Sequence, residues 1–327
     1  MKNDSHLPNG DFLRIQPKIR NPRIWIAIAV SAIFSLCVTF CAAAQDETQQ
    51  EETQQQSPAA VVPRMEADPT AGMLDTGFRH LYELDFAAAR AEFVKYQKLR
   101  PDDPFGKAAE AASYLFEQFN QKGVLTSDFF CNDSKFLNGI DGNPADNHNP
   151  AFLDANRNAR EMAKKLVAEN PKNPHALLVL TMTDGMEADY DTLIEKKQLA
   201  GLSMVRQAEA QANVVLGLDP TAGDANVALG AGNYIIGSLP GFKRALVWFG
   251  GIHGDKQRGM DQMQKAIANG HYFRPFAKIL LALAYERERQ PDRARILLSE
   301  LAVEFPTNPI FAHELSLLDQ RHTCGKH

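Results

Sequence analysis

The sequence predicts an all-α fold, a solenoid of antiparallel helical hairpins, over residues 71–320. Apolar residues recur three and four positions apart along this stretch, and the alternation typical of β-strands is missing. Turns that contain Pro, such as 100–104, 170–174 and 305–309, interrupt the pattern. Pro ends one helix, and Asp or Asn caps the next, so each turn is expected to join two packed helices.

The pattern divides into about eleven helices, which form five hairpins and a closing helix. Their expected ranges are 72–84, 86–99, 105–122, 151–169, 174–188, 197–217, 222–237, 255–269, 274–289, 291–304 and 308–319. Two long stretches remain between them, 123–150 and 238–254. Both are rich in Gly, together with Asn, Asp or Pro, and this composition is typical of loops.

Residues 1–44 have the parts of a secretory signal peptide. A basic stretch ends at Arg23, an uncharged apolar run follows at 24–40, and small residues precede the expected cleavage point after Ala44. The mature chain then begins at Gln45 and lies in the periplasm or is secreted. An alternative stays open, in which the apolar run is not removed and anchors the chain in the inner membrane, although it is short for a membrane span.

Residues 45–70 form a disordered polar spacer, because they contain too few apolar side chains to build a core. A flexible tail at 321–327 follows the last predicted helix. Outside the signal the chain keeps Cys131 and Cys324, and an even pair in an oxidising compartment favours a disulfide. A solenoid can hold two such distant residues far apart, so their pairing stays open. Lipidation at Cys41 is a further alternative.

The composition excludes one class of partner. The chain has 327 residues, of which 44 % are hydrophobic, and this is enough to bury a sizeable core. Its net charge is −5, whereas a nucleic-acid-binding protein usually has a basic face. A protein partner is therefore expected rather than a nucleic acid. The oligomeric state does not follow from the sequence.

Two helix pairs have small residues at matched positions. Counting back from Pro101 places Gly77, Ala89 and Phe93 at positions that are small, small and large in tetratricopeptide repeats. Counting back from Pro306 gives a second set that fits the same repeat pattern, with the small residues Ala282 and Ala294 and the large residues Leu281 and Tyr285. The chain therefore resembles the tetratricopeptide-repeat superfamily over roughly 72–320, and this resemblance implies a helical scaffold.

A closer likeness lies in residues 237–306. A Pro-containing loop and an apolar stretch are followed there by Gly-x-x-Gly-Asp-Lys-x-x-Gly and a helix ending in Ala. This order is similar to the inclusion-body-clearance family of tetratricopeptide proteins. It is also similar to the periplasmic tetratricopeptide component of tripartite substrate-binding transporters, which the predicted export suits better. Neither family supplies a catalytic residue.

The sequence contains no motif of a serine hydrolase, a zinc metalloprotease or a P-loop nucleotide-binding protein. Asp184 and Glu187 share a helix face, and paired carboxylates can do acid–base work. An ordinary structural role is the alternative for this pair. We therefore expect no enzyme activity, no cofactor and no metal site.

The start of the eighth predicted helix is a candidate anion site. Gly254 and Asp255 lead into it, and Lys256 and Arg258 stand in its first turn, where free N–H groups favour anions. The alternative is that Asp255 only caps the helix. The preceding patch at 242–249 is apolar with two cations, and it either packs over the solenoid or contacts a membrane.

A candidate site for a protein partner lies on the helix expected at 222–237. Asn226 and Asn233 are on one face of this helix, with Tyr234 beside them. We expect the first helix of each hairpin to face the concave side of the solenoid. Amide side chains there can bind the backbone of an extended peptide. Alternatively, these residues cap loops or form a polar seam between helices.

Two functions follow as expectations. The first is an exported scaffold that binds a protein partner or assembles an envelope complex through a concave groove. The second is an accessory subunit of a solute transport system that binds or passes a small molecule. A wide polar groove would favour the scaffold, and an apolar pocket within the superhelix would favour the accessory subunit.

Overall fold

The structure, a computed structural model, describes residues 70–241, 244 and 253–320. Four of the predicted segments lie wholly or mostly outside these residues: the signal at 1–44, the spacer at 45–70, the patch at 242–249 and the tail at 321–327. All regular elements of the described part are helices, so the predicted all-α helical-repeat fold is confirmed. Within that part, no helix is long and apolar enough to span a membrane.

The structure describes the following elements in chain order. They are α1 (Ala71–Tyr82), α2 (Phe86–Leu99), α3 (Pro104–Gln121), α4 (Ser127–Cys131), α5 (Asp133–Asn138), η1 (Pro144–Asn147), α6 (Pro150–Glu169), α7 (Pro174–Asp189), η2 (Tyr190–Ile194), α8 (Gln198–Leu218), η3 (Gly223–Ala225), α9 (Asn226–Ser238), α11 (Lys256–Asn269), α12 (Arg274–Arg287), α13 (Pro291–Glu304) and α14 (Pro309–Asp319).

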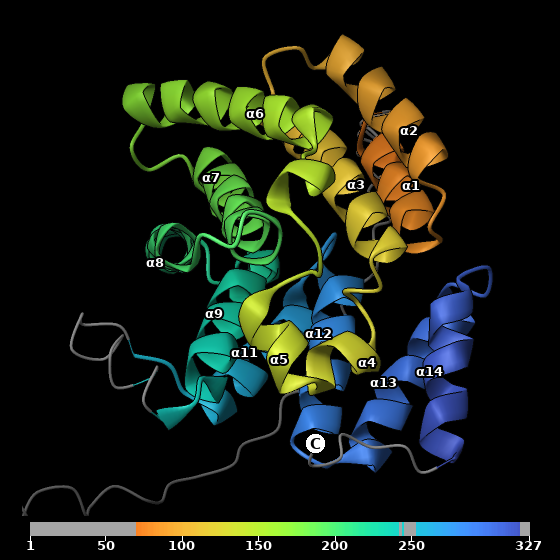
Figure 1. Cartoon of the computed structure of the whole chain (residues 1–327). Coiled ribbons are helices and arrows are strands. Elements are labelled where there is room, and N and C mark those ends of the chain that lie inside the picture. The colour runs from red at the N-terminus through yellow and green to blue at the C-terminus, as the bar shows by residue number, and fades with distance from the viewer. Residues whose placement is uncertain (1–69, 242–243, 245–252, 321–327) are drawn as a thin grey trace, which may run out of the picture. The chain divides into compact units, whose positions relative to one another are not determined.

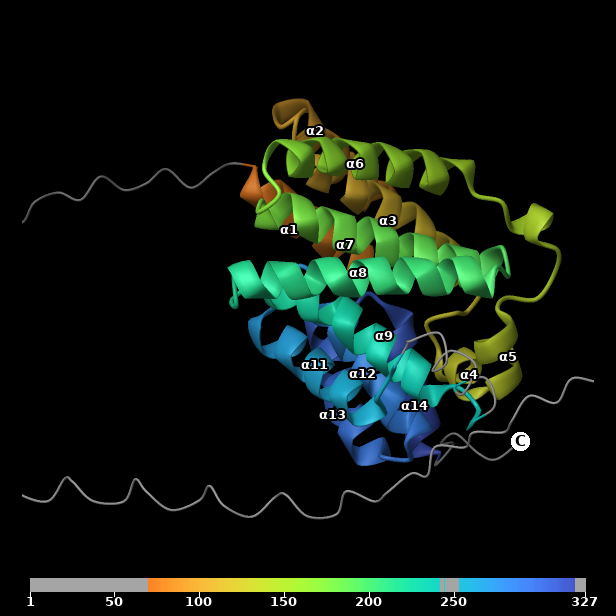
Figure 2. The ribbon, with the colours of Figure 1, turned by 90° about the vertical axis from the view of Figure 1, so that its left-hand side faces the viewer.

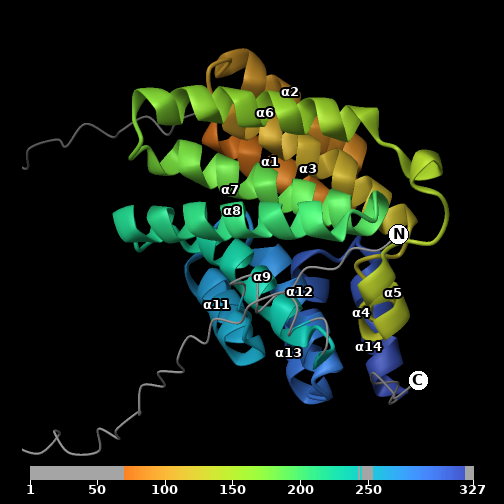
Figure 3. The same cartoon turned by 60° about the vertical axis from the view of Figure 1, so that its left-hand side comes forward.

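The long helices pack in chain order as the hairpins α1–α2, α3–α6, α7–α8, α9–α11 and α12–α13, with α14 last. In Figure 1 this array follows a ring, from α1 and α2 past α6 and α7 to α8, and back through α9 to α13 and α14. Figures 2 and 3 show α8 as a long helix between two groups, with α1, α2, α3, α6 and α7 on one side and α9 to α14, together with α4 and α5, on the other.

Several helices begin with the same pair of residues, an Asp or Asn followed by Pro. At the start of α3, Oδ1 of Asp103 accepts a hydrogen bond from the N–H of Phe105 at 2.8 Å. The same arrangement opens α6, α7 and α14, with Asn149, Asn173 and Asn308 as the caps. Pro suits the first helical position because the N–H there has no partner within the helix. The predicted turns at 100–104, 170–174 and 305–309 therefore fix where α3, α7 and α14 begin.

The small residues of the repeat pattern lie where helices cross. A Cβ added at Gly77 would lie 2.4 Å from the ring of Phe93, so α1 and α2 approach this closely only because position 77 has no side chain. Ala89 is fully buried in the same hairpin, and Ala282 and Ala294 are fully buried in the α12–α13 hairpin. The packing predicted for these positions is thus present at both ends of the array.

The first helix contacts the last hairpins, so the array closes on itself. The Oη of Tyr82 donates a hydrogen bond to the carbonyl oxygen of Tyr272 at 2.8 Å. The carbonyl oxygen of Tyr82 accepts another from Nδ2 of Asn308, also at 2.8 Å. The rings of Phe78 and Tyr272 stack with their centroids 4.9 Å apart. These contacts hold α1 against the segments that precede α12 and α14.

The stretch 123–150 differs from the expected loop, because it contains α4, α5 and η1. These helices have only four to six residues each, which is too short for helical periodicity to be visible in a sequence. Nη1 of Arg287 donates to the carbonyl oxygen of Phe130 at 2.7 Å, and the N–H of Ser127 donates to Oε1 of Glu314 at 3.4 Å. The segment therefore joins α3 to the α12–α14 end of the array.

Candidate functional site

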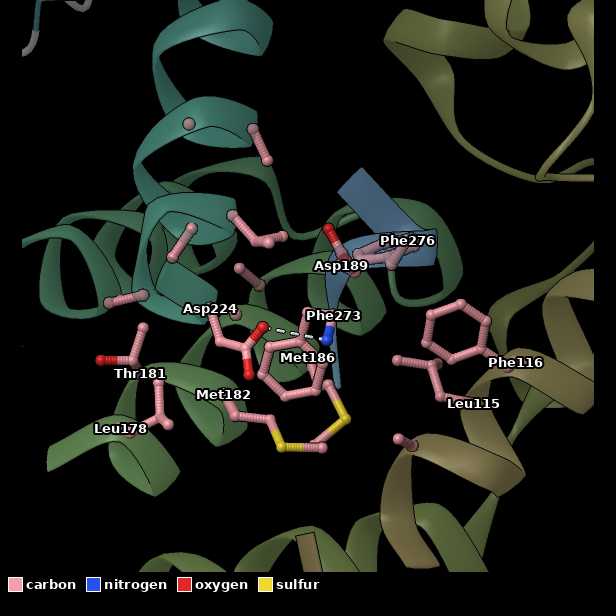
Figure 4. A pocket seen from close by; sticks show the side chains of 18 of the residues that line it. Leu115, Phe116, Leu178, Thr181, Met182, Met186, Asp189, Asp224, Phe273 and Phe276 are labelled. Carbon is pink, nitrogen blue, oxygen red and sulfur yellow. Dashed lines mark hydrogen bonds between the residues drawn. The ribbon is translucent and has the colours of Figure 1, made fainter. Parts of the chain in front are cut away.

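A pocket, which we call the inner pocket, lies between the helices of the ring (Figure 4). It is lined chiefly by α1, α3, α7, α9 and α12, which are the first helices of the five hairpins. Its volume is about 130 Å³. The helices that the solenoid pattern places on the concave side therefore meet around a pocket.

The walls of the inner pocket are mainly apolar. Its aromatic and sulfur-containing residues are Phe78, Tyr82, Phe116, Phe119, Met182, Met186, Phe273 and Phe276. The rings of Phe116 and Phe276 meet edge to face with their centroids 5.1 Å apart. Gly185 keeps part of the space free, because a Cβ added there would have no heavy atom within 4 Å apart from its own helix.

Few polar groups reach the inner pocket, and most of them are already bonded. The charged lining side chains that the structure describes are Asp189 and Asp224, and none of the described lining residues is basic. The hydroxyl of Tyr82 donates to a backbone carbonyl oxygen at 2.8 Å, and the hydroxyl of Thr181 does the same at 2.9 Å. The electrostatic potential within the pocket therefore depends mainly on these two carboxyl groups.

Asp224 belongs to the framework of the pocket. Its Oδ1 accepts hydrogen bonds from the N–H groups of His271 and Phe273 at 2.8 and 3.0 Å, and its Oδ2 accepts one from Tyr272 at 3.1 Å. Burial raises the pKa of this carboxyl above its ordinary value, while the three hydrogen bonds act in the opposite direction. Figure 4 shows the bond to Phe273. Asp224 thus fixes the turn that leads into α12.

Asp189 is different, because its carboxyl has no hydrogen-bond or ion-pair partner among the described residues. It is the last residue of α7 and lines the inner pocket. Burial raises the pKa of Asp189 from 3.8 to about 7, since no neighbouring cation or donor offsets the loss of hydration. The inner pocket therefore contains one unpartnered carboxyl within apolar walls.

The backbone after Asp189 forms a single π-helical turn, η2. Such turns are rare and are frequent at functional sites. The buried Tyr190 accepts a hydrogen bond on Oη from the N–H of Asn149 at 3.0 Å, and the N–H of Ile140 donates to the carbonyl oxygen of Leu193 at 2.9 Å. The segment between α3 and α6 thus holds the end of α7 in place.

The structure places Asn226, Asn233 and Tyr234 between helices. Nδ2 of Asn226 donates to a carbonyl oxygen of the preceding turn at 3.2 Å, and Nδ2 of Asn233 donates to Oε1 of Gln262 on α11 at 3.1 Å. Tyr234 is fully buried, and its Oη donates to Oε1 of Glu288 at 3.0 Å. The residues of α9 that line the inner pocket are instead Val227, Ala228, Ala231, Gly232 and Ile235. The polar-seam interpretation fits this arrangement, and a role in binding a partner stays a prediction.

The candidate anion site at the start of α11 has internal partners. Oδ1 of Asp255 accepts a hydrogen bond from the N–H of Arg258 at 2.7 Å, so Asp255 caps the helix as the alternative interpretation expected. Nζ of Lys256 lies 2.7 Å from Oε1 of Glu288. Gly254 packs closely against α9. Anion binding by these residues stays a prediction.

Asp184 and Glu187 share a single cation. Nη2 of Arg160 lies 2.8 Å from Oδ1 of Asp184, and Nη1 lies 2.7 Å from Oε2 of Glu187. Nε2 of Gln211 donates to the second oxygen of Asp184 at 3.0 Å. These contacts tie α6, α7 and α8 together and agree with the structural role considered for this pair.

Cys131, the last residue of α4, is disulfide-bonded. Cys324 lies outside the described residues, so its pairing with Cys131 stays a prediction. The bond between Ser127 and Glu314 places α4 beside α14, the helix that precedes Cys324. Cys131 therefore belongs to a helix that contacts the one directly before Cys324 in the sequence.

Comparison with known proteins gives little further information. No family model and no curated protein matches the chain. A solved structure of a thermophilic tetratricopeptide-repeat protein from Thermus thermophilus is similar at 16 % identity and a TM-score of 0.41, over 76 % of this chain and 97 % of that one. This similarity is too low to support an argument, and the helical-repeat fold is assigned here from the arrangement of the helices themselves.

Proposed function

We propose that this chain is an exported binding protein that holds a small, mainly apolar molecule in the inner pocket, as an accessory subunit of a solute transport system. The observation that supports this proposal is the apolar pocket between the first helices of the hairpins. A wide polar groove would have favoured a scaffold for polypeptides. The geometry favours a small molecule, because the closed ring leaves a small apolar pocket in place of the long groove of an open solenoid.

The size of the inner pocket limits what it can hold. Its volume of about 130 Å³ is close to that of an engineered apolar cavity of about 150 Å³ that binds benzene in another protein. A ligand with roughly one aromatic ring, or a short branched chain, therefore fits. Each Å² of apolar surface that such a ligand removes from water contributes roughly 25 cal/mol to binding.

The closed ring also favours binding of a small ligand over an extended one. The hydrogen bonds of Tyr82 to Tyr272 and Asn308 join the two ends of the array across the interior. A pocket whose walls are already held together loses less conformational entropy when a ligand binds. A ligand therefore meets a largely preformed site.

A protein partner remains a second candidate, and exposed apolar side chains on the outside of the ring favour it. Leu199 and Val214 on α8 are exposed, as is Val303 on α13. Their separation over the surface does not define a single interface, because scattered exposed apolar residues are normal. The two candidates are compatible, since a protein that passes on a solute has to dock with the component that receives it.

Export is part of the proposal and depends on the signal at 1–44. Cleavage after Ala44 leaves Gln45 as the first residue of the mature chain. Mass spectrometry of the protein from its native envelope fraction should find this N-terminus. An intact Met1 would instead indicate the alternative, in which residues 24–40 anchor the chain in the inner membrane.

Filling the inner pocket tests the binding of a small molecule. Gly185 lines the pocket, and a side chain there would meet no heavy atom within 4 Å of its Cβ apart from its own helix, so Gly185→Leu should occupy the ligand's space. Gly217 on α8 is an exposed helical glycine with equally free surroundings, so Gly217→Leu is the matched control. Both exchanges increase helix propensity by a similar amount of about 1 kcal/mol.

The measurement is the thermal unfolding temperature of the purified protein in the presence of toluene. A ligand that binds only the folded state raises this temperature with its concentration. We expect the increase in the wild type and in Gly217→Leu, and none in Gly185→Leu. An equal response of all three proteins, or no response of any, would contradict binding in the inner pocket.

A further inference from the structure

The Asp189 carboxyl has no counter-charge in the part of the chain that the structure describes. No lining residue of the inner pocket is basic there, and Asp224 already accepts three backbone hydrogen bonds. In Figure 4 the Asp224 carboxylate is joined to Phe273, whereas no bond is drawn to Asp189. An unpaired carboxyl in apolar surroundings is unfavourable, and natural proteins usually pair such a group or use it.

The other side chains of the inner pocket also favour a cation. The negative faces of aromatic rings attract an ammonium group, and Phe273, Phe276 and Phe116 all line this pocket. The two carboxyl groups give the pocket a negative potential, because no positive side chain balances them in the described wall. An anionic ligand would meet repulsion from both.

The place of Asp189 in the backbone is also fixed. It ends α7 directly before the π-helical turn, and the bonds of Tyr190 and Leu193 to the segment between α3 and α6 hold that turn. A carboxyl on a held backbone can select a ligand by the position of one charged group. A surface carboxyl that moves freely would not select a ligand by the position of its charged group.

We propose that the ligand of the inner pocket is a small apolar amine, whose ammonium group pairs with the carboxylate of Asp189 while its hydrocarbon part contacts the phenylalanine rings. This inference rests on the proposed function and specifies its ligand class. Asp189 supplies the specificity for charge, and the apolar walls supply most of the affinity.

Three probes with the same ring and different charge test the proposal: benzylamine, benzyl alcohol and benzoate. Their dissociation constants are measured by calorimetry with the full-length protein at pH 8. We expect benzylamine to bind about tenfold more tightly than benzyl alcohol, because a charge-assisted hydrogen bond is roughly twice as strong as a neutral one. Benzoate should bind more weakly than both.

The Asp189→Asn variant keeps the shape of the side chain and removes its charge. It should bind benzylamine and benzyl alcohol with similar affinity, while its affinity for benzyl alcohol stays within about threefold of the wild type. Asp102→Asn, at an exposed position in the turn before α3, is the matched control and should keep the preference for the amine. Thermal unfolding of each variant checks that it is folded.

The pH dependence of amine affinity is a second test of the contact between the ammonium group and Asp189. The titratable side chains that face the inner pocket from the described elements are Asp189 on α7, Asp224 on η3 and Tyr82 on α1. Since the ammonium group pairs with the ionised carboxyl, and burial raises the pKa of Asp189 to about 7, amine affinity should fall about tenfold from pH 8 to pH 6. Asp189→Asn should remove this dependence, whereas titration of Asp224 would leave it intact.

Equal affinity of the wild type for benzylamine and benzyl alcohol would overturn the amine proposal and leave binding of an apolar molecule standing. An amine preference that survives in Asp189→Asn would also overturn it. If none of the probes binds, and toluene has no effect on the wild type or Gly185→Leu, the proposed function itself fails.

Discussion

The Oη of Tyr82 donates a hydrogen bond to the carbonyl oxygen of Tyr272, 2.8 Å away in space and 190 positions along the chain. The carbonyl oxygen of Tyr82 accepts a second bond from Nδ2 of Asn308. One residue at the end of α1 thus binds the segments before both α12 and α14. An array of hairpins that touch only their neighbours would stay open, and these contacts close it around the inner pocket.

Replacing Tyr82 by Phe removes the hydroxyl from this closure and keeps the ring. We expect the free energy of unfolding to fall by about 1 kcal/mol, because the net contribution of a typical hydrogen bond is of this size. Urea unfolding measures the change. Tyr114→Phe is the matched control, since no hydrogen bond of the Tyr114 hydroxyl occurs among the described residues. Equal stability of the two variants would show that the closure contributes nothing measurable.

The hairpins were predictable from the sequence, and their closure was not. Asp103-Pro104 and Asn173-Pro174 mark helix starts through local hydrogen bonding, and Gly77 marks a helix crossing through its size. Closure depends on the rotation between successive hairpins, which accumulates over the whole array. The bond between Tyr82 and Tyr272 has no local signal that would indicate it.

In the candidate site, too, the local features were predictable from the sequence, and the contacts between distant segments were not. The spacing of Asn226 and Asn233 predicts that they share one face of a helix, but spacing does not say which neighbouring element that face meets. Asp189 has no distinctive spacing among the acidic residues near it. A signal was available in 174–188, a predicted helix that is apolar on nearly all sides and is therefore expected to be buried. An acidic residue directly after such a helix is expected to lose water, as Asp189 does.

The double variant Asn226→Ala with Asn233→Ala tests the remaining prediction of partner binding. Loss of the Asn233 amide leaves Oε1 of Gln262 without this donor, so we expect the free energy of unfolding to fall by roughly 1–3 kcal/mol. Thermal unfolding and affinity capture of partners are measured together. A partner-binding role requires lost capture with an unchanged unfolding temperature, and lower stability with unchanged capture would contradict that role.

Asn213→Ala is the matched control for this variant. Nδ2 of Asn213 donates to the carbonyl oxygen four residues earlier at 2.8 Å, as Nδ2 of Asn233 does at 3.0 Å, but Asn213 is exposed on α8. Its removal should change stability by less than about 0.5 kcal/mol, since exposed groups can bind water instead. A large loss of stability in Asn213→Ala would mean that the hydrogen bond within the helix, and not burial between helices, explains the loss in the double variant.

The disulfide of Cys131 is predicted to join it to Cys324. Alkylation without a reductant, followed by peptide mapping, should recover one linked peptide that contains both residues. Cys324→Ser should lower the free energy of unfolding by about 2–4 kcal/mol, because the bridge closes a long loop in the unfolded chain. Two freely alkylated thiols, or a bridge from Cys131 to another cysteine, would contradict the pairing.

The last prediction concerns pH and the buried carboxyl of Glu286. Burial, together with repulsion from Glu314 on α14, raises the pKa of Glu286 from 4.5 to about 8. The folded protein therefore keeps a proton that the unfolded chain releases between these values. The contribution to stability is present in full below about pH 4.5 and is lost as the pH rises toward 8, by at most about 1.4 kcal/mol per pH unit.

Glu286→Gln is neutral at every pH, so this loss should be absent from it. Asp189 has a pKa that burial raises to about 7 and affects stability in the same direction, so only the difference between variant and wild type reports on Glu286. We expect the two proteins to be similar near pH 4.5 and the variant to be more stable at pH 8, in urea unfolding at a series of pH values. Glu169→Gln, at an exposed position on α6, should follow the wild type at every pH. Parallel curves for Glu286→Gln and the wild type would mean that Glu286 is hydrated and ionised in the folded protein, because only a carboxyl that loses water on folding takes up the proton.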